Sequence, residues 1–444
     1  MDLVTGVDEY LASGLLPYYY GLVAVCALYL LHKFKYKTEA IFIIMLFFEG
    51  LFVFLSATIP LLTNLHKIGF SLFAVLLYLK PAIKSKKSNL DFLIIGCFCL
   101  IGLAFFISYL QNDSNILTSL SQLMKKYCIP LLFYFGVKSH ITNENKMEWY
   151  ADLFTWLIIM QIPLQFVKLV LFGSGESLIG SISFLGGGAS NIVPILGFFF
   201  IWVKQNGVLK NKDWFIVILL FLSAVFIGNK RSVVFTLPII IIYINTFVGK
   251  TFNAMRLIKV LPIILVIAII GVKTNPTLNP ENSRWGSFDI KYVFDYAYDY
   301  SFGESRAKLD VGYGRGQGTI YFINTVKSEF DTKEMLFGIG VDEVLTEYAD
   351  FDSIKYGISS KGSAGAFVQN FIALGLLGTV AIFIFGLLLA NIINDRMLFW
   401  GFTFLLLFEY FLLYNSIISI NACAILFIFI CNYFNYKRFY FHSA

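Results

Sequence analysis

Long runs of apolar residues recur along most of this chain, and they restrict it to a membrane fold. Two of them, FIVILLFLSAVFI and VVFTLPIIIIYI, flank the short segment GNKRS at 228–232. A helix needs ~20 consecutive, mainly apolar residues to cross a bilayer. Charged residues make up 14% of the 444 residues, against roughly a quarter in soluble globular proteins. The sequence therefore predicts an all-α, polytopic integral membrane protein.

We predict about 13 spanning helices from the ~20-residue criterion. The predicted spans are 15–31, 40–60, 68–80, 91–110, 119–137, 150–171, 191–203, 214–228, 232–248, 257–272, 363–390, 397–413 and 417–433. The chain then divides into ten helices over 1–272, a large loop over 273–361, and three helices with a short tail over 362–444. MDLVTGVDEY at the start is acidic, whereas a signal peptide begins with basic residues, so we expect the first helix to be retained.

Lys and Arg are concentrated in alternate short loops, and this asymmetry predicts the orientation of the chain. The basic segments are HKFKYK, KPAIKSKK, KSHITNENK, KQNGVLKNK, GKTFNAMRLIK, NDR and YKR. They hold about 18 basic residues, against about three in the other short loops. Because basic loops stay in the cytoplasm, the N-terminus is predicted to be periplasmic and the C-terminus cytoplasmic. An odd number of helices requires the same arrangement.

The long segment 273–361 is predicted to lie outside the membrane and to contain short helices. In QGTIYFINTVKSEF we expect Ile320, Ile323, Val326 and Phe330 to share one helical face. VDEVLTEYAD at 341–350 is a second predicted helix. We expect these helices to form a cap over the outer opening. Three arginines of this segment could reach down toward it: Arg284, Arg306 and Arg315.

Five basic side chains are predicted at or near the outer ends of helices, against the positive-inside pattern. They are Lys125, Lys126, Lys168, Lys230 and Arg231. Such charges are costly in a membrane unless they are paired, face water or bind an anion. Each one alone could instead snorkel to the interface. Together they favour an electropositive outer pocket for an anionic ligand.

Other polar residues in the apolar runs carry weaker signals. Glu49 and Glu409 have no evident partner set in the sequence. They are compatible with an ion path, with helix-packing hydrogen bonds or with a position at the cytoplasmic interface. His66 is predicted to lie in the short outer loop after the second helix, and the large loop contains no histidine. GYGRGQG at 312–318 is interpreted as a turn that presents Arg315. No CxxC or HExxH spacing suggests a metal, so no cofactor is expected.

Four stretches resemble the bacterial O-antigen polymerases (Wzy), within the polysaccharide polymerase and O-antigen ligase superfamily. They are SFLGGGASNIVPILG, IGNKRSVVFTLPI, GYGRGQGTIYFINTVKSEFDTKEMLFGIG and KGSAGAFVQNFIALGLLG. The architecture is also similar, with many helices, a large late outer loop and a few closing helices. The ligases of this superfamily carry a His-Asn pair where this chain reads about Ala364-Gly365. The resemblance is therefore closer to a polymerase.

The resemblance implies a reaction at the outer face of the membrane. A growing glycan on undecaprenyl diphosphate is transferred to the non-reducing end of a new lipid-linked repeat unit, and the lipid diphosphate leaves. Arginine holds phosphate oxygens with two parallel hydrogen bonds and stabilises developing negative charge. Arg231 and Arg315 are thus the expected diphosphate contacts, with Lys230 in support. Arg284 and Trp285 are candidates for sugar contact.

The reaction also needs a base for the acceptor hydroxyl, and an outer carboxylate can serve. Glu176, Asp342 and Glu343 are the candidates. The implied partners are the lipid-linked donor and acceptor, membrane lipid and a chain-length regulator protein; neither nucleic acid nor a sugar nucleotide is expected. Three alternatives remain: an O-antigen ligase acting on lipid A core, a lipid-linked oligosaccharide flippase, and a non-enzymatic assembly partner.

Overall fold

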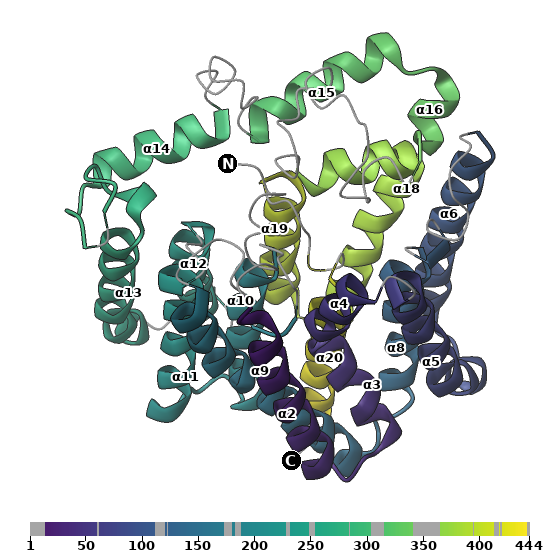
Figure 1. The fold of residues 1–444 in the computed structure, drawn as a ribbon, viewed down its shortest axis with the longest axis horizontal. Coiled ribbons are helices and arrows are strands. Elements are labelled where there is room, and N and C mark those ends of the chain that lie inside the picture. Colours follow the sequence, from purple (N-terminus) through teal and green to yellow (C-terminus); the bar gives the residue numbers. More distant parts are fainter. Residues whose placement is uncertain are drawn as a thin grey trace.

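The described part of the chain is a bundle of helices with an arm of further helices across one end (Figure 1). The computed structural model describes residues 14–59, 62–111, 120–121, 123–172, 180–182, 188–227, 231–247, 254–283, 285–302, 315–340, 365–393, 395–412, 417 and 420–441. These residues are mostly helical and include no β-strand. This agrees with the predicted all-α class.

The described part of the chain contains the following helices. From the N-terminus they are α2 (Leu16–Lys33), α3 (Thr38–Phe47), α4 (Glu49–Thr58), α5 (Leu62–Lys84), α6 (Asn89–Gln111), the π-helix η1 (Met124–Cys128), α8 (Ile129–Lys138), α9 (Glu144–Phe172), α10 (Gly188–Lys204), α11 (Asn211–Leu222) and the π-helix η2 (Ser223–Ile227). The remainder are α12 (Arg231–Phe247), α13 (Ala254–Thr274), the 3-10 helix η3 (Pro276–Leu278), α14 (Ile290–Phe302), α15 (Arg315–Glu329), α16 (Thr332–Phe337), α18 (Ala366–Asn391), α19 (Arg396–Leu412) and α20 (Asn421–Phe441).

Three of the described helices are long and apolar enough to cross a membrane, namely Asn89–Leu110, Glu144–Phe172 and Ala366–Asn391. α3 and α4 make a fourth candidate if they count as one span bent by 67°. Shorter apolar helices are Asn191–Lys204, Ser232–Ile244 and Ile264–Thr274. The described helices therefore indicate association with a membrane, and the total of about 13 spans stays a prediction.

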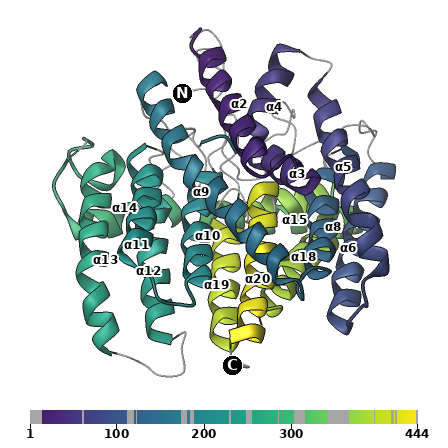
Figure 2. The ribbon, with the colours of Figure 1, turned by 90° about the horizontal axis from the view of Figure 1, so that it is seen from below.

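Helix α20 lies in the middle of the bundle, and its first 13 residues, 421–433, are all buried. Figure 2 shows α19 and α20 between α10 on one side and α8 and α18 on the other. Aromatic rings fill the contact with α9: Phe154 stacks on Phe429 with ring centroids 4.8 Å apart, and Phe429 stacks on Tyr433 at 5.2 Å. Rings of this size bury much surface from a few positions, which favours a closely packed centre.

Several predicted boundaries are wrong in instructive ways. The predicted span 40–60 is interrupted at Phe48, where α3 ends and α4 begins. The predicted short span 68–80 is the middle of the longer α5, which retains Pro81 near its end. His66 lies within α5 and not in a loop, and its Nδ1 is 3.2 Å from the Ser56 hydroxyl. The third predicted helix is therefore longer than its apolar run, and His66 within it is paired with Ser56 of α4.

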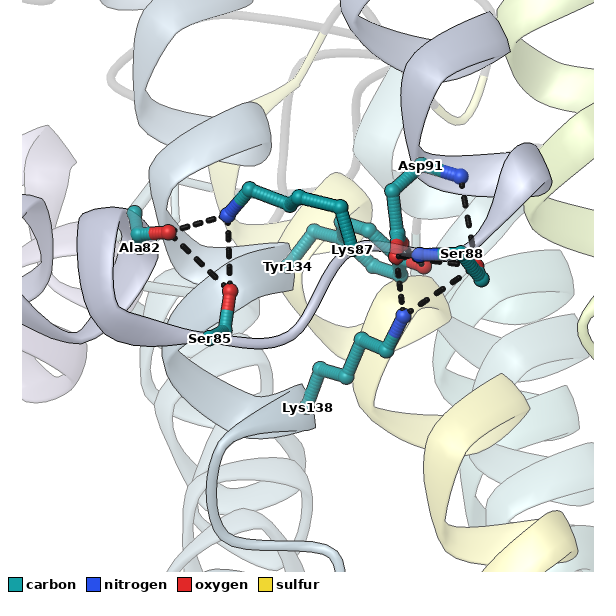
Figure 3. Close-up of polar contacts among 7 residues, drawn as sticks. All are labelled: Ala82, Ser85, Lys87, Ser88, Asp91, Tyr134 and Lys138. Atoms are coloured by element: carbon teal, nitrogen blue, oxygen red, sulfur yellow. Dashed lines mark hydrogen bonds and ion pairs between the residues drawn. The ribbon is translucent and has the colours of Figure 1, made fainter.

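A buried carboxylate organises one end of the bundle, where α5, α6 and α8 meet (Figure 3). Asp91 has no exposed surface. It accepts hydrogen bonds from the backbone N–H of Ser88 at 2.6 Å and from the Tyr134 hydroxyl at 2.7 Å, and it forms an ion pair with Lys138. Ser88 and Asp91 together cap the start of α6. Nearby, burial lowers the pKa of Lys87, whose Nζ donates to the Ser85 hydroxyl.

Further ion pairs tie basic residues to acidic residues on neighbouring helices. Lys204 pairs with Asp152 at 2.9 Å and Lys437 with Glu148 at 2.9 Å. Lys146 pairs with Glu39. All these lysines belong to segments whose positive charge predicted a cytoplasmic location. The pairs anchor the basic loops to the helix ends.

Helices α14, α15 and α16 form the arm across the opposite end from the C-terminus (Figure 1). The predicted helix 317–330 is confirmed by α15, and two of the four residues predicted to share a face, Val326 and Phe330, are buried together. Phe322, Val326 and Phe330 are buried against α18, whereas Ile320 and Ile323 are exposed. A helix that packs against one neighbour buries one stripe only. In α15 and the residue after it, that stripe contains the aromatic rings of Phe322 and Phe330. Helix α14 was not predicted, and the predicted helix 341–350 lies outside the described residues.

Candidate functional site

Lys125 is paired with Glu49, which corrects the interpretation of Glu49 as an acid without an evident partner. Lys125 lies in the π-helix η1, and its Nζ forms an ion pair with Glu49 Oε1 at the start of α4. The two side chains are only 15% and 12% exposed. Two opposite charges that are largely removed from water need each other, since either alone would be strongly destabilising. Because Glu49 neutralises the charge of Lys125, this lysine does not add a free cation to the predicted electropositive pocket.

The break between α3 and α4 is closed by a single serine. The Ser181 hydroxyl donates to the Phe47 carbonyl at 2.8 Å, and the Ser181 carbonyl accepts the Gly50 N–H at 2.9 Å. Gln161 on α9 holds Ser181 on both sides: its Nε2 donates to Ser181 Oγ at 2.9 Å, and its Oε1 accepts from Ser181 N at 2.8 Å. A bend leaves backbone N–H and C=O groups without their helical hydrogen-bond partners, and apolar surroundings cannot replace them. Here Ser181 supplies these partners.

Lys168 lies on the same face of α9 as Gln161 and is 4% exposed. Its Nζ is 5.0 Å from the centre of the Tyr19 ring, a distance at which a cation is attracted to an aromatic face. The Tyr19 hydroxyl donates to the Gly180 carbonyl at 3.1 Å, next to Ser181. The prediction that Lys168 lies near the end of its helix is confirmed, since α9 ends four residues later at Phe172.

These contacts define what we call the bend cluster, formed by α2, α4, α9, η1 and the segment 180–182. Its members are Tyr19, Glu49, Lys125, Gln161, Lys168 and Ser181. The sequence contained a signal for part of it, because Gln161, Gln165 and Lys168 are spaced as one polar stripe on an apolar helix. Ser181 carried no such signal. Its role depends on the bend in another helix, which no local pattern predicted.

Arg231 is the first residue of α12. Its neighbour Ser232 donates to Asn191 Oδ1 on α10 at 2.8 Å, which joins the first turns of the two helices. α12 packs beside α13, and a Cβ at Gly271, near the end of α13, would lie 2.9 Å from Val234 Cγ1, near the start of α12. The two helices are therefore antiparallel. Arg231 thus lies at the end of the bundle where α13 leads into α14.

Arg315 is the first residue of α15, so GYGRGQG does not form a turn throughout, because its last four residues are helical. Figure 1 shows α15 beginning beside the end of α14, with which it is in contact. Trp285 is 66% exposed and adopts a left-handed backbone conformation with φ of 68°. Both candidate arginines thus begin a helix at the same end of the bundle, where backbone N–H groups favour anions.

The other predicted site residues cannot be placed. Lys230, Arg284, Arg306, Glu176, Asp342 and Glu343 lie outside the described residues, and of Arg231 and Arg315 only the backbone is described. Lys126 is half-buried in η1 next to Lys125. These assignments therefore stay predictions.

Glu409 is a buried carboxylate three residues from the end of α19. Its Oε2 accepts the Ile417 N–H at 2.9 Å, while Oε1 has no hydrogen-bond partner among the described residues. The sequence analysis weighed an ion path against a packing hydrogen bond for this residue. The contact with Ile417 favours packing, since it ties Ile417 to α19. Within the described ranges no group of three His, Cys, Asp or Glu side chains could hold a metal ion.

No protein-family model, curated protein or solved structure matches this chain.

Proposed function

We propose that the chain is a surface-polysaccharide polymerase of the O-antigen type, embedded in a bacterial inner membrane by about 13 helices. In this proposal the N-terminus and the arm α14–α16 are periplasmic, and the C-terminus is cytoplasmic. One observation supports it most: Arg231 and Arg315 each begin a helix, at the end of the bundle that the arm crosses. Two guanidinium groups at helix N-termini are suited to hold a diphosphate.

The proposed reaction moves a growing glycan. The bond between its anomeric carbon and the lipid diphosphate oxygen breaks, and a bond to the acceptor hydroxyl oxygen of a new lipid-linked repeat forms. The hydroxyl proton passes to a carboxylate, for which Glu176, Asp342 and Glu343 are the proposed candidates. The leaving group is undecaprenyl diphosphate, whose negative charge Arg231 and Arg315 would stabilise with help from Lys230. Arg284, Trp285 and Arg306 would contact the substrate.

The surroundings of Gly365 favour a polymerase over the alternative ligase. A Cβ atom at this position would lie 2.9 Å from the Phe411 carbonyl oxygen on α19. Backbone atoms cannot yield as a flexible side chain can, so the asparagine that the resemblance aligns with Gly365 would displace α18 from α19. The side chain that the resemblance assigns to ligases therefore has no room at this position.

The function is tested by the surface-glycan ladder of a deletion strain. We expect the deletion to leave lipid A core that bears one repeat unit, and the wild-type gene to restore the ladder. Bare core without a single-repeat band would exclude a polymerase and would favour a ligase or a flippase. An unchanged ladder would exclude any role in this polymerisation.

A further inference from the structure

Helix α14 has three distinct faces, although it is only 13 residues long. One face rests on the protein through Val293 and Tyr296. The second is apolar and exposed: Phe294 is 70% and Tyr298 66% exposed, and the same stripe includes Ile290 and Phe302. The third face is charged and exposed, and it consists of Lys291, Asp295 and Asp299.

The spacing accounts for this division. Ile290, Phe294, Tyr298 and Phe302 recur every four residues and therefore form one stripe along the helix. The charged residues lie one position later in each turn, so they border the stripe on one side only. Large aromatic side chains in such a stripe are uncommon on a surface that faces water alone. A helix with one apolar and one charged exposed face suits the boundary between lipid and water.

The apolar stripe continues a surface on the preceding helix. α13 exposes Ile258, Leu261, Leu265 and Ile269, which also recur along one face. Its second half, Ile264–Thr274, is among the apolar helices described above. Between α13 and α14, Trp285 and Phe288 are exposed as well. Exposed apolar side chains thus recur along the chain from the apolar half of α13, through the turn, to α14.

Hydrogen bonds hold the described residues of the turn between α13 and α14, so the direction in which α14 leaves α13 is set by the fold. Asn279 is fully buried, and its Nδ2 donates to the carbonyls of Asn275 at 3.0 Å and Ser283 at 2.8 Å. The Gly286 N–H donates back to the Lys273 carbonyl at 3.1 Å. A Cβ at Gly286 would come within 2.2 Å of the Asn279 side chain. Hydrogen bonds from Ser287 also lower the pKa of the Glu281 carboxyl.

We propose that α14 is an interfacial helix whose face Ile290–Phe294–Tyr298–Phe302 is embedded in the headgroup and upper acyl region of the phospholipid leaflet beside α13. The charged face then points to water. In this proposal α14 does not cover an opening, as the predicted cap would. It lies on the membrane surface, and α15 follows it in the chain. Aromatic side chains are well suited to this depth of the bilayer. The inference concerns lipid contact and does not depend on the proposed enzymatic activity.

Photo-crosslinking of the full chain in nanodiscs of phosphatidylethanolamine and phosphatidylglycerol tests this. Phe294 or Tyr298 is replaced with p-benzoylphenylalanine, an aromatic substitution at an exposed position that leaves the protein-facing side intact. Asp299 replaced in the same way is the matched control on the charged face. After irradiation and digestion, the mass of the tryptic peptide 292–306, released by cleavage after Lys291 and Arg306, is measured by mass spectrometry. We expect a phospholipid adduct from positions 294 and 298, at least tenfold more abundant than from position 299.

Three results would overturn the proposal. A crosslinked dimer would show that a second copy covers this face, and a crosslink within one chain would show that another segment does. Equal lipid adducts at positions 294 and 299, or none at any position, would show that the stripe has no preference for lipid. Position 302, on the same stripe, repeats the measurement if one variant is poorly produced.

Discussion

Gly338 and Gly375 meet backbone to backbone where the arm joins the bundle. Gly338 follows α16 with φ of 82°, and Gly375 interrupts α18 with φ of 62°. A Cβ on Gly338 would lie 2.6 Å from Gly375 N, and one on Gly375 would lie 2.5 Å from Gly338 N. The Ile339 N–H donates to the Ile372 carbonyl at 2.8 Å, just before the interruption. The two glycines therefore dock the arm on α18.

Gly338→Ala and Gly375→Ala should separate α16 from α18. Each adds a methyl group against backbone atoms and places alanine at a positive φ, which costs about 1–3 kcal/mol in strain alone. We expect faster hydrogen exchange in 332–340 at near-normal membrane abundance, and loss of the glycan ladder. Gly102→Ala on α6 is the control, because a Cβ there meets nothing within 4 Å. Exchange in 332–340 at the wild-type rate for both variants would contradict this docking.

Arg231→Ala and Arg231→Lys should both abolish the ladder at matched protein levels. A lysine supplies charge but not the planar fork that binds two phosphate oxygens, and loss of one such donor typically lowers a rate on the order of 100-fold or more. The same is expected for Arg315→Lys. Lys84→Ala, an exposed cation at the end of α5, is the control and should retain the ladder. Full polymerisation by Arg231→Ala would remove this residue from the proposed site.

Removing one partner of the Lys125–Glu49 pair should destabilise the protein strongly. Glu49→Gln leaves the lysine charge largely buried, for which about 3–5 kcal/mol is typical. We expect a marked loss of folded protein in a thermal assay of the purified protein in detergent. The double variant Glu49→Gln/Lys125→Met should recover much of it. The control is Asp152→Asn, which breaks the pair with Lys204, because Asp152 is 65% exposed and such pairs contribute about 0–1 kcal/mol. Similar losses of folded protein for Glu49→Gln and Asp152→Asn would contradict the expected difference between a buried and an exposed ion pair.

Ser181→Ala should weaken the closure of the bend between α3 and α4. It removes the donor to the Phe47 carbonyl and one partner of Gln161, and a buried polar group left without a partner costs about 1–3 kcal/mol. We expect a lower midpoint of thermal unfolding in detergent. Ser328→Ala is the control, since the Ser328 hydroxyl is exposed and bonds only within its own helix. Identical midpoints for the two variants would show that the serine is dispensable.

The residue types of the candidate site and their closeness to helix starts were predictable, but their tertiary contacts were not. Arg231 and Arg315 were identifiable because a charge next to an apolar run, or in a glycine-rich segment, can be recognised in the sequence alone. The predicted helices 232–248 and 317–330 also placed them next to helix starts, and α12 and α15 begin at these arginines. The contact of Ser232 with Asn191 of α10 could not be predicted, because it depends on how two helices pack. The pairing of Glu49 with Lys125 joins residues 76 positions apart, a separation over which no local pattern carries information.

Hydrophobic runs by themselves determined that the chain is helical and belongs at a membrane, since apolar length and charge distribution act locally. Only the tertiary structure decided that the second predicted helix is interrupted at Phe48, and that Ser181 hydrogen-bonds to the backbone on both sides of the interruption. It also decided that α15 buries Phe322 and exposes Ile320, and that α14 keeps an apolar face uncovered. Local periodicity defines the possible faces of a helix. Which face is buried depends on the neighbour that packs against it.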